Sequence, residues 1–120
     1  MKLLIGLALL LVAPGLYAEA IDGFWQHEEE PVWIEISAGG GQVVRNDNRP
    51  EAVGFEMLRD LRPTEGDDSQ WSGEVYAARL GEYKDATLTL EGDDLLRFKV
   101  KVGFMSRTVL WRRVASMPAE

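Results

Sequence analysis

Strict alternation of apolar and polar residues is the feature of this chain that most restricts its fold. It is clearest over 96–102, where basic residues stand between the apolar positions Leu96, Phe98, Val100 and Val102. Residues 32–36 and 87–90 alternate in the same way. Because successive side chains of a β-strand point to opposite faces, each segment has one face for a core and one for water. The pattern predicts an antiparallel sheet that is solvated on one side.

Short runs of Gly, Pro, Asn and Asp separate these segments. They fall at 39–41, 46–50, 63–69 and 92–94, and the last is short enough for a tight hairpin. Residues 53–61 fit helical as well as alternating spacing, but Gly54 favours a strand or an irregular strand. About seven or eight short strands with close turns are typical of a sandwich or a barrel. Because sequential hairpins favour closure, we expect an all-β, antiparallel up-and-down β-barrel.

The first twenty residues have the layout of a secretory signal peptide. Lys2 precedes an apolar run over 3–13, a Pro-Gly pair ends the run, and small residues then offer cleavage after Ala18 or Ala20. The run is much shorter than the roughly 20 residues of a membrane-spanning helix. We therefore expect a signal peptide at 1–20, export to the periplasm or beyond, a β-barrel domain at 21–116 and a C-terminal tail at 117–120. No transmembrane segment is expected in the mature chain.

The chain has no cysteine and an acidic balance. It holds 13 basic and 20 acidic residues, for a net charge of −7. Without cysteine there is no disulfide and no lipid-modified cysteine, so packing alone must hold a domain of about a hundred residues. Binding to phosphate backbones needs a dense basic patch, so the balance argues against a nucleic-acid partner.

A Gly-x-Trp motif opens the first expected strand, and an arginine lies in the last. The residues are Gly23 and Trp25 at the beginning, and Trp111 and Arg113 at the end. This combination resembles the structural signature of lipocalin-like barrels, in which the arginine lies across the tryptophan face at the closed end. A guanidinium over an indole gains cation–π energy, and its donors can tie the two ends of the barrel together.

Further short motifs follow in order between these two. They are Asn48-Arg49-Pro50, 54–61, Trp71-Ser72-Gly73-Glu74-Val75-Tyr76, 88–95, Val102-Gly103-Phe104 and Arg107-Thr108. The succession resembles the bacterial secreted family called domain of unknown function 2147, over about Gly23 to Val114. The resemblance implies a lipocalin-like fold. It implies no particular activity, because the biochemical role of that family is not established.

No set of residues has the spacing of a catalytic or metal site. His27 is the one histidine and precedes an acidic run at 28–30, but a zincin motif would need a second histidine where Pro31 stands. No serine lies in a Gly-x-Ser-x-Gly motif. We therefore expect no metal, no cofactor and no enzyme. A hydrolase built from carboxylates that meet only in space is the last-ranked alternative.

The inward-facing apolar residues are the candidates for function. If the barrel leaves space between them, a small hydrophobic or amphipathic ligand could bind, and the candidates are Ile34, Ile36, Trp71, Val75, Leu88, Phe98 and Phe104. If they interdigitate, the protein is instead an envelope protein-interaction module that uses an exposed Trp33 or the turn at Phe104. The basic stripe over 97–101 could face an anionic partner such as a lipid head group, but alternation favours an ordinary wet face.

Overall fold

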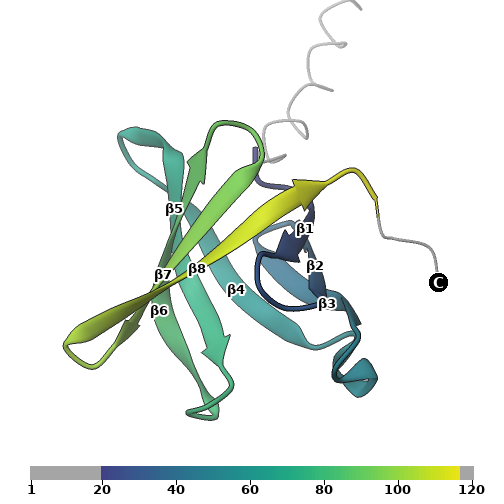
Figure 1. Ribbon diagram of the computed structural model, residues 1–120. Coiled ribbons are helices and arrows are strands. Elements are labelled where there is room, and N and C mark those ends of the chain that lie inside the picture. Colours follow the sequence, from purple (N-terminus) through teal and green to yellow (C-terminus); the bar gives the residue numbers. More distant parts are fainter. Residues whose placement is uncertain (1–19, 117–120) are drawn as a thin grey trace, which may run out of the picture.

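The computed structural model describes residues 20–116, which form a closed barrel of eight antiparallel strands (Figure 1). The strands are β1 (Gly23–His27), β2 (Val32–Ser37), β3 (Gly40–Asn46), β4 (Glu56–Thr64), β5 (Asp67–Ala77), β6 (Glu82–Glu91), β7 (Leu95–Val102) and β8 (Met105–Val114). A short 3₁₀ helix, η1 (Pro50–Ala52), precedes β4. Each strand pairs with the next in sequence, and β8 returns to pair with β1. The predicted all-β up-and-down barrel is confirmed.

Two sequence predictions fall outside this region. The signal peptide at 1–20, apart from Ala20, and the tail at 117–120 lie outside the described residues. Within residues 20–116, no helix has the length and apolar character needed to cross a membrane.

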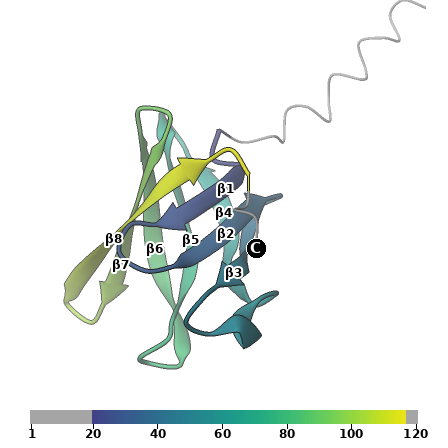
Figure 2. The ribbon, with the colours of Figure 1, turned by 45° about the vertical axis from the view of Figure 1, so that its right-hand side comes forward.

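The pairing of β1 with β8 closes the barrel, and Figure 2 shows β1 lying between β8 and β2. Trp25 stands directly opposite Arg113 across this pair, and the guanidinium carbon lies 4.4 Å from the centroid of the indole. The indole Nε1 donates to the carbonyl of Ile21 at 2.9 Å. Because Trp25 and Ile21 are both fully buried, they fill this end of the barrel.

One apolar core runs through the barrel. The alternation over 96–100 is confirmed, since Leu96, Phe98 and Val100 are buried while Lys99 is exposed. The other buried members are Ile21, Trp25, Ile34, Ile36, Val43, Leu58, Trp71, Val75, Ala86, Leu88 and Trp111. Removing this much apolar surface from water is the main stabilising term for a domain without disulfides.

Strand β4 is irregular in its middle. Asp60 has a positive φ of 53°, and the register with β5 shifts between Arg59 and Arg62. Opposite this bulge, a Cβ at Gly73 would lie 2.9 Å from the carbonyl oxygen of Arg59 and 2.7 Å from Cδ2 of Leu61. The close approach of β4 to β5 therefore requires a glycine at position 73.

Trp33 was expected on the outer face, and this expectation is wrong. The residue is only 9% exposed, and the guanidinium of Arg45 lies 5.1 Å from its ring centroid. The register between β2 and β3 shifts between Trp33 and Ile34, and both residues are buried. Such a bulge breaks the strict alternation on which the expectation depended.

Two turns differ from their predicted extents. The loop expected at 63–69 is much shorter, because β4 continues to Thr64 and β5 begins at Asp67. Likewise, Gly40 and Gly41 belong to β3 rather than to the turn before it. The hairpin at 92–94 and the strand within 53–61 are confirmed, the latter beginning at Glu56.

Candidate functional site

The two ends of the barrel differ. The chain before β1 and the β2–β3, β4–β5 and β6–β7 hairpins lie at one end, where Trp25 and Ile21 fill the interior. The β1–β2, β3–β4, β5–β6 and β7–β8 connections lie at the other, called here the open end. A cavity of about 640 Å³ opens there, between the first, third and fourth of these connections. The barrel is therefore hollowed at its open end.

The floor of this cavity is apolar and its rim is polar. The floor is formed by side chains of the core and its margin: Val75, Phe98, Val100, Val102, Val109 and Trp111. The polar rim comes from His27 and 28–30 on one side and from Arg79, Arg107 and Thr108 on the other. An apolar pocket with a few polar groups at its edge suits a molecule with an apolar body and a polar head.

Trp111 lines the cavity and has an indole N–H that donates no hydrogen bond within the described residues. Its side chain is 3% exposed, and its indole Nε1 is buried without a hydrogen-bond acceptor among the described residues. The ring lies between His27 and Phe98, at centroid distances of 4.9 and 5.4 Å. A buried N–H without an acceptor costs about 1–3 kcal/mol. Because the Nε1 atom itself is buried, an acceptor oxygen from a ligand would reach it only after a shift of neighbouring side chains.

The acidic turn beside His27 is ordered by local bonds. The Nδ1 atom of His27 accepts from the backbone N–H groups of Glu29 and Glu30 at 3.0 and 3.1 Å. Glu28 accepts from Arg112 Nε at 2.9 Å. These bonds hold the turn in a fixed shape at one side of the rim. Within residues 20–116, no group of three or more potential metal ligands comes together.

The wall beside the cavity is reinforced from outside. The Tyr83 hydroxyl donates to the Glu56 carbonyl at 2.6 Å, which joins β6 to β4 across β5. The guanidinium of Arg59 lies 3.6 Å from the Tyr83 ring centroid, and its Nε donates to Glu74 at 2.7 Å. The bond to Glu74 raises the pKa of Arg59 above its ordinary value. The cavity is thus backed by a wall whose strands are linked by side chains.

Only some of the predicted ligand-binding residues meet at this cavity. Val75 and Phe98 line it. Ile36 and Trp71 instead line a smaller hollow of about 390 Å³ at the filled end. Ile34 and Leu88 are completely buried in the core, and Phe104 is 98% exposed on the β7–β8 connection. The predicted set therefore divides between the cavity, the core and the surface.

The sequence reasoning missed three kinds of cavity residue. Trp111 was assigned only a structural part, although it also lines the floor. Val100 and Val102 continue the alternation beyond Phe98, and this signal could have placed them at the open end. Arg79 carried no sequence signal, and Arg107 stood only in a short motif of the family resemblance, because only the closed topology brings their two connections to one rim.

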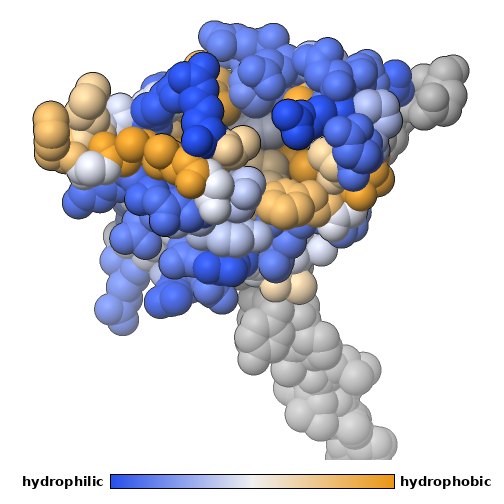
Figure 3. All heavy atoms as spheres, turned by 90° about the horizontal axis from the view of Figure 1, so that it is seen from below, coloured by the Kyte–Doolittle hydropathy of each residue, from blue (hydrophilic) through white to orange (hydrophobic). Residues whose placement is uncertain are grey.

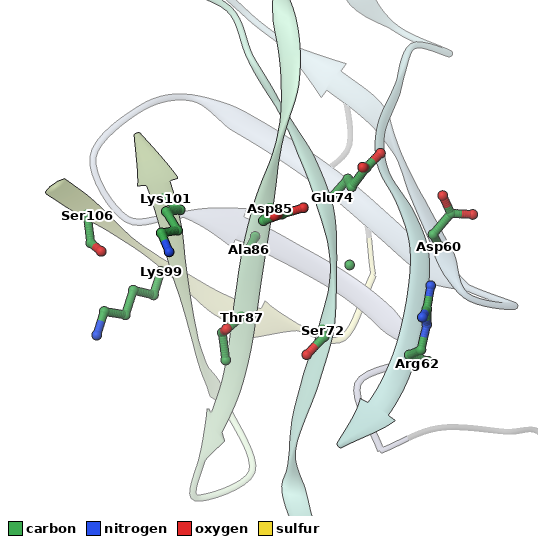
Figure 4. A pocket seen from close by; sticks show the side chains of 11 residues that line it. Asp60, Arg62, Ser72, Glu74, Asp85, Ala86, Thr87, Lys99, Lys101 and Ser106 are labelled. Carbon is green, nitrogen blue, oxygen red and sulfur yellow. The ribbon is translucent and has the colours of Figure 1, made fainter. Parts of the chain in front are cut away.

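A second hollow, of about 560 Å³, lies on the outer surface of β4–β8 (Figure 4). Its polar side chains diverge, with Lys99 and Ser106 on one side and Asp60 and Arg62 on the other. A third hollow, of about 820 Å³, lies beside the β2–β3 hairpin and is lined largely by glycine and polar residues. Neither offers the apolar floor that distinguishes the cavity at the open end.

Comparison with known proteins places the chain in a family. Residues 23–113 match the family described as "Uncharacterized protein conserved in bacteria (DUF2147)", which covers nearly all of the described barrel. No curated protein and no solved structure matches the chain. The chain belongs to this family, as the order of its short motifs indicated.

Proposed function

We propose that this member of the DUF2147 family binds a small amphipathic molecule in the cavity at the open end of its barrel, without chemical conversion. The observation that carries the proposal is the apolar floor of this cavity, to which Trp111, Phe98 and Val100 contribute, beneath a polar rim. A ligand with an apolar body would cover the floor, and its acceptor would pair with the Trp111 Nε1 once neighbouring side chains shift to admit it.

The form of the barrel supports entry at one end. Trp25 and Ile21 fill the opposite end, so an apolar chain would enter between the β1–β2, β5–β6 and β7–β8 connections. Its apolar part would displace water from Phe98 and Val100, which supplies the driving force. Its polar head would stay near the rim, where Arg79 and Arg107 offer donors.

The place of action belongs to the same proposal. The apolar run and small residues before position 21 have the layout of a signal peptide, so the protein would work in the periplasm or outside the cell. An exported carrier of apolar molecules needs an enclosed site, because such molecules are poorly soluble in water.

Binding is tested first with the protein purified from its source. Native mass spectrometry should show a one-to-one complex with a small molecule, and a fluorescent fatty-acid analogue should bind to the emptied protein. The variant Val102→Trp fills the cavity near its rim and should weaken the probe at least about tenfold through lost apolar contact. Lys99→Trp, on the opposite face of the same strand, is the matched control and should bind normally.

The part of Trp111 is tested separately. Trp111→Phe keeps an aromatic ring but removes the donor, so it should weaken the fatty-acid probe about tenfold. It should change binding of a pure hydrocarbon probe such as diphenylhexatriene much less. Absence of any co-purified molecule together with absence of probe binding would remove the proposal.

A further inference from the structure

The exposed large apolar side chains gather at the open end. Those of the described residues lie in or beside three of its four connections: Val53 and Phe55 before β4, Leu80 between β5 and β6, and Phe104 with Met105, the first residue of β8, at the β7–β8 turn. Phe104 is 98% exposed. Figure 3 looks onto this end and shows hydrophobic residues crossing it as a band, with hydrophilic residues on either side. Apolar groups so exposed at one end indicate a contact surface.

At two of these three connections, basic residues stand without an acidic residue in the connection itself. Arg79 precedes Leu80, while Lys101 and Arg107 flank Phe104 and Met105 on the two strands of the β7–β8 hairpin. All three basic side chains are exposed. We call these six residues the basic corner: Arg79, Leu80, Lys101, Phe104, Met105 and Arg107.

The basic residues of this corner have no acidic partner within the part of the chain that the structure describes. Elsewhere in the described part of the chain, the arginines at 45, 59, 97 and 112 each form an ion pair, whereas Arg49 and Arg62 form none. Arg79, Lys101 and Arg107 form no ion pair, and neither does Lys99, which lies two residues before Lys101 on β7. In a chain with a net charge of −7, this is a local excess of unpaired positive charge. Such a patch attracts an anionic partner.

The rest of the open end is acidic on balance, although the β3–β4 connection also carries Arg49. The β1–β2 connection carries Glu28, Glu29 and Glu30, and the apolar residues before β4 stand between Glu51 and Glu56. An anionic surface would therefore attract the basic corner and repel the remainder of the rim. The charge distribution favours one orientation of contact.

We propose that the basic corner docks on the surface of a lipid bilayer that contains anionic lipids. Phe104, Met105 and Leu80 enter the interface, while Arg79, Lys101 and Arg107 meet the lipid head groups. Amphipathic surfaces of this kind bind membranes through apolar burial together with attraction to anionic lipids.

The distribution of the apolar side chains favours a bilayer over a protein partner. Protein interfaces concentrate their binding energy in packed, central clusters. Here Leu80 and the Phe104–Met105 pair project from separate connections. A fluid lipid surface can accept each projection independently, without a matching pocket.

This contact rests mainly on the exposed apolar side chains and the unpaired positive charge, whereas the proposed ligand binding rests on the apolar floor of the cavity. The two proposals nevertheless share one end of the barrel, since Arg79, Leu80 and Arg107 also line the cavity. A barrel docked at its basic corner would hold its cavity beside the lipid head groups. An amphipathic ligand could then move between the bilayer and the barrel without crossing bulk water.

The test is co-sedimentation of the exported, processed protein with vesicles. We expect binding to mixed phosphatidylcholine–phosphatidylglycerol vesicles, weak binding to phosphatidylcholine alone, and a loss of binding as salt is raised. Phe104→Ser should weaken binding about tenfold, because the apolar tip no longer enters the interface. The double variant Lys101→Gln/Arg107→Gln should weaken it by a similar or larger factor.

Two variants serve as matched controls. Val53→Ser removes an exposed apolar residue from an acidic connection at the same end. Arg62→Gln removes an exposed arginine that lies toward the filled end of the barrel. Both should bind the mixed vesicles like the unaltered protein. Folding of every variant is checked by its thermal transition, which should not move for residues as exposed as Phe104.

Three results would overturn the proposal. They are equal binding to both kinds of vesicle, no binding to either, and an equal loss of binding in the control variants. Sedimentation velocity without vesicles tests whether a second copy of the chain is the partner instead. A dimer that Phe104→Ser abolishes would show that it is. Val102→Trp, which blocks the cavity, should leave vesicle binding intact, so the failure of one proposal is distinguishable from the failure of the other.

Discussion

The guanidinium of Arg113 lies 4.4 Å above the indole of Trp25 and donates to three backbone carbonyls. Those carbonyls belong to Ala20, Asp22 and Asp93, at 2.6, 3.0 and 2.8 Å. One side chain on the last strand thus holds the chain before the first strand and the β6–β7 hairpin. It links three segments that are distant in sequence at the filled end of the barrel.

Arg113→Ala should lower the free energy of unfolding by about 2–4 kcal/mol, since it removes charge-assisted hydrogen bonds and a cation–π contact. Arg113→Lys should recover only part of this, because an ammonium lacks the planar fork of donors. The measurement is chemical denaturation. The neighbouring Arg112, 56% exposed and paired with Glu28, is the control, and Arg112→Ala should cost less than about 1 kcal/mol. Equal losses of stability in Arg113→Ala and Arg112→Ala would contradict the special part of Arg113 in linking these segments.

Trp33→Ala should destabilise the barrel by about 3–5 kcal/mol, as expected for a large buried side chain. Phe104→Ala, at a residue that is 98% exposed, should change stability by no more than about 0.5 kcal/mol. Thermal unfolding of the two variants makes the comparison. If Trp33→Ala were as stable as the unaltered protein, the assignment of Trp33 to the buried residues would be wrong.

Gly73→Ala should be destabilising by about 1–3 kcal/mol, because the added methyl group would overlap the Arg59 carbonyl and the Leu61 side chain. Adding Leu61→Ala relieves only the contact with the flexible side chain. The double variant should therefore not regain the stability of Leu61→Ala alone. Full recovery would show that β4 can move away from β5 at little cost.

Acid should weaken the ion pair on the β6–β7 hairpin. Arg97 donates to both carboxylate oxygens of Glu91, at 2.7 and 3.2 Å. These hydrogen bonds lower the pKa of Glu91 below its ordinary value. A lowered folded-state pKa contributes stability above the unfolded-state pKa, and this is lost as the pH falls through the lowered value. The ordinary carboxyl pKa of about 4.3 marks the upper edge of that window.

The check is denaturation of the unaltered protein and Glu91→Gln at several pH values. The unaltered protein should be the more stable one at neutral pH, and the difference should shrink as the pH falls below the ordinary carboxyl range. Since both side chains are about 40% exposed, salt should also reduce the difference. A difference that does not change with pH would assign the effect to something other than ionisation.

Much of the barrel could be predicted because each hairpin carries its own signal. The alternation over 96–102 places Leu96, Phe98 and Val100 inward, and the turn at 92–94 fixes the register with β6. The pairing of β1 with β8 followed from the tryptophan and arginine at the two ends of the sequence. These are features that a strand or a turn imposes locally on its residue types.

Other features depend on contacts that alternation does not encode. The bulge at Trp33 buries two successive residues, so a period of two assigns one of them wrongly. Asp67 and Ser69 have turn-forming side chains, yet they lie at the beginning of a long strand, where Asp67 accepts from the Ser69 backbone at 3.0 Å. The rim of the cavity comes from distant connections, and only the closed topology shows that they meet.

The succession of neighbouring hairpins has a consequence for how the chain reaches this structure. Seven of the eight strand pairings join segments that are adjacent in sequence, and only the β1–β8 pairing spans the whole domain. The entropy lost in bringing distant segments together is therefore concentrated in this one step. Barrel closure should come late in folding, with substitutions at the seam accelerating unfolding more than they slow folding.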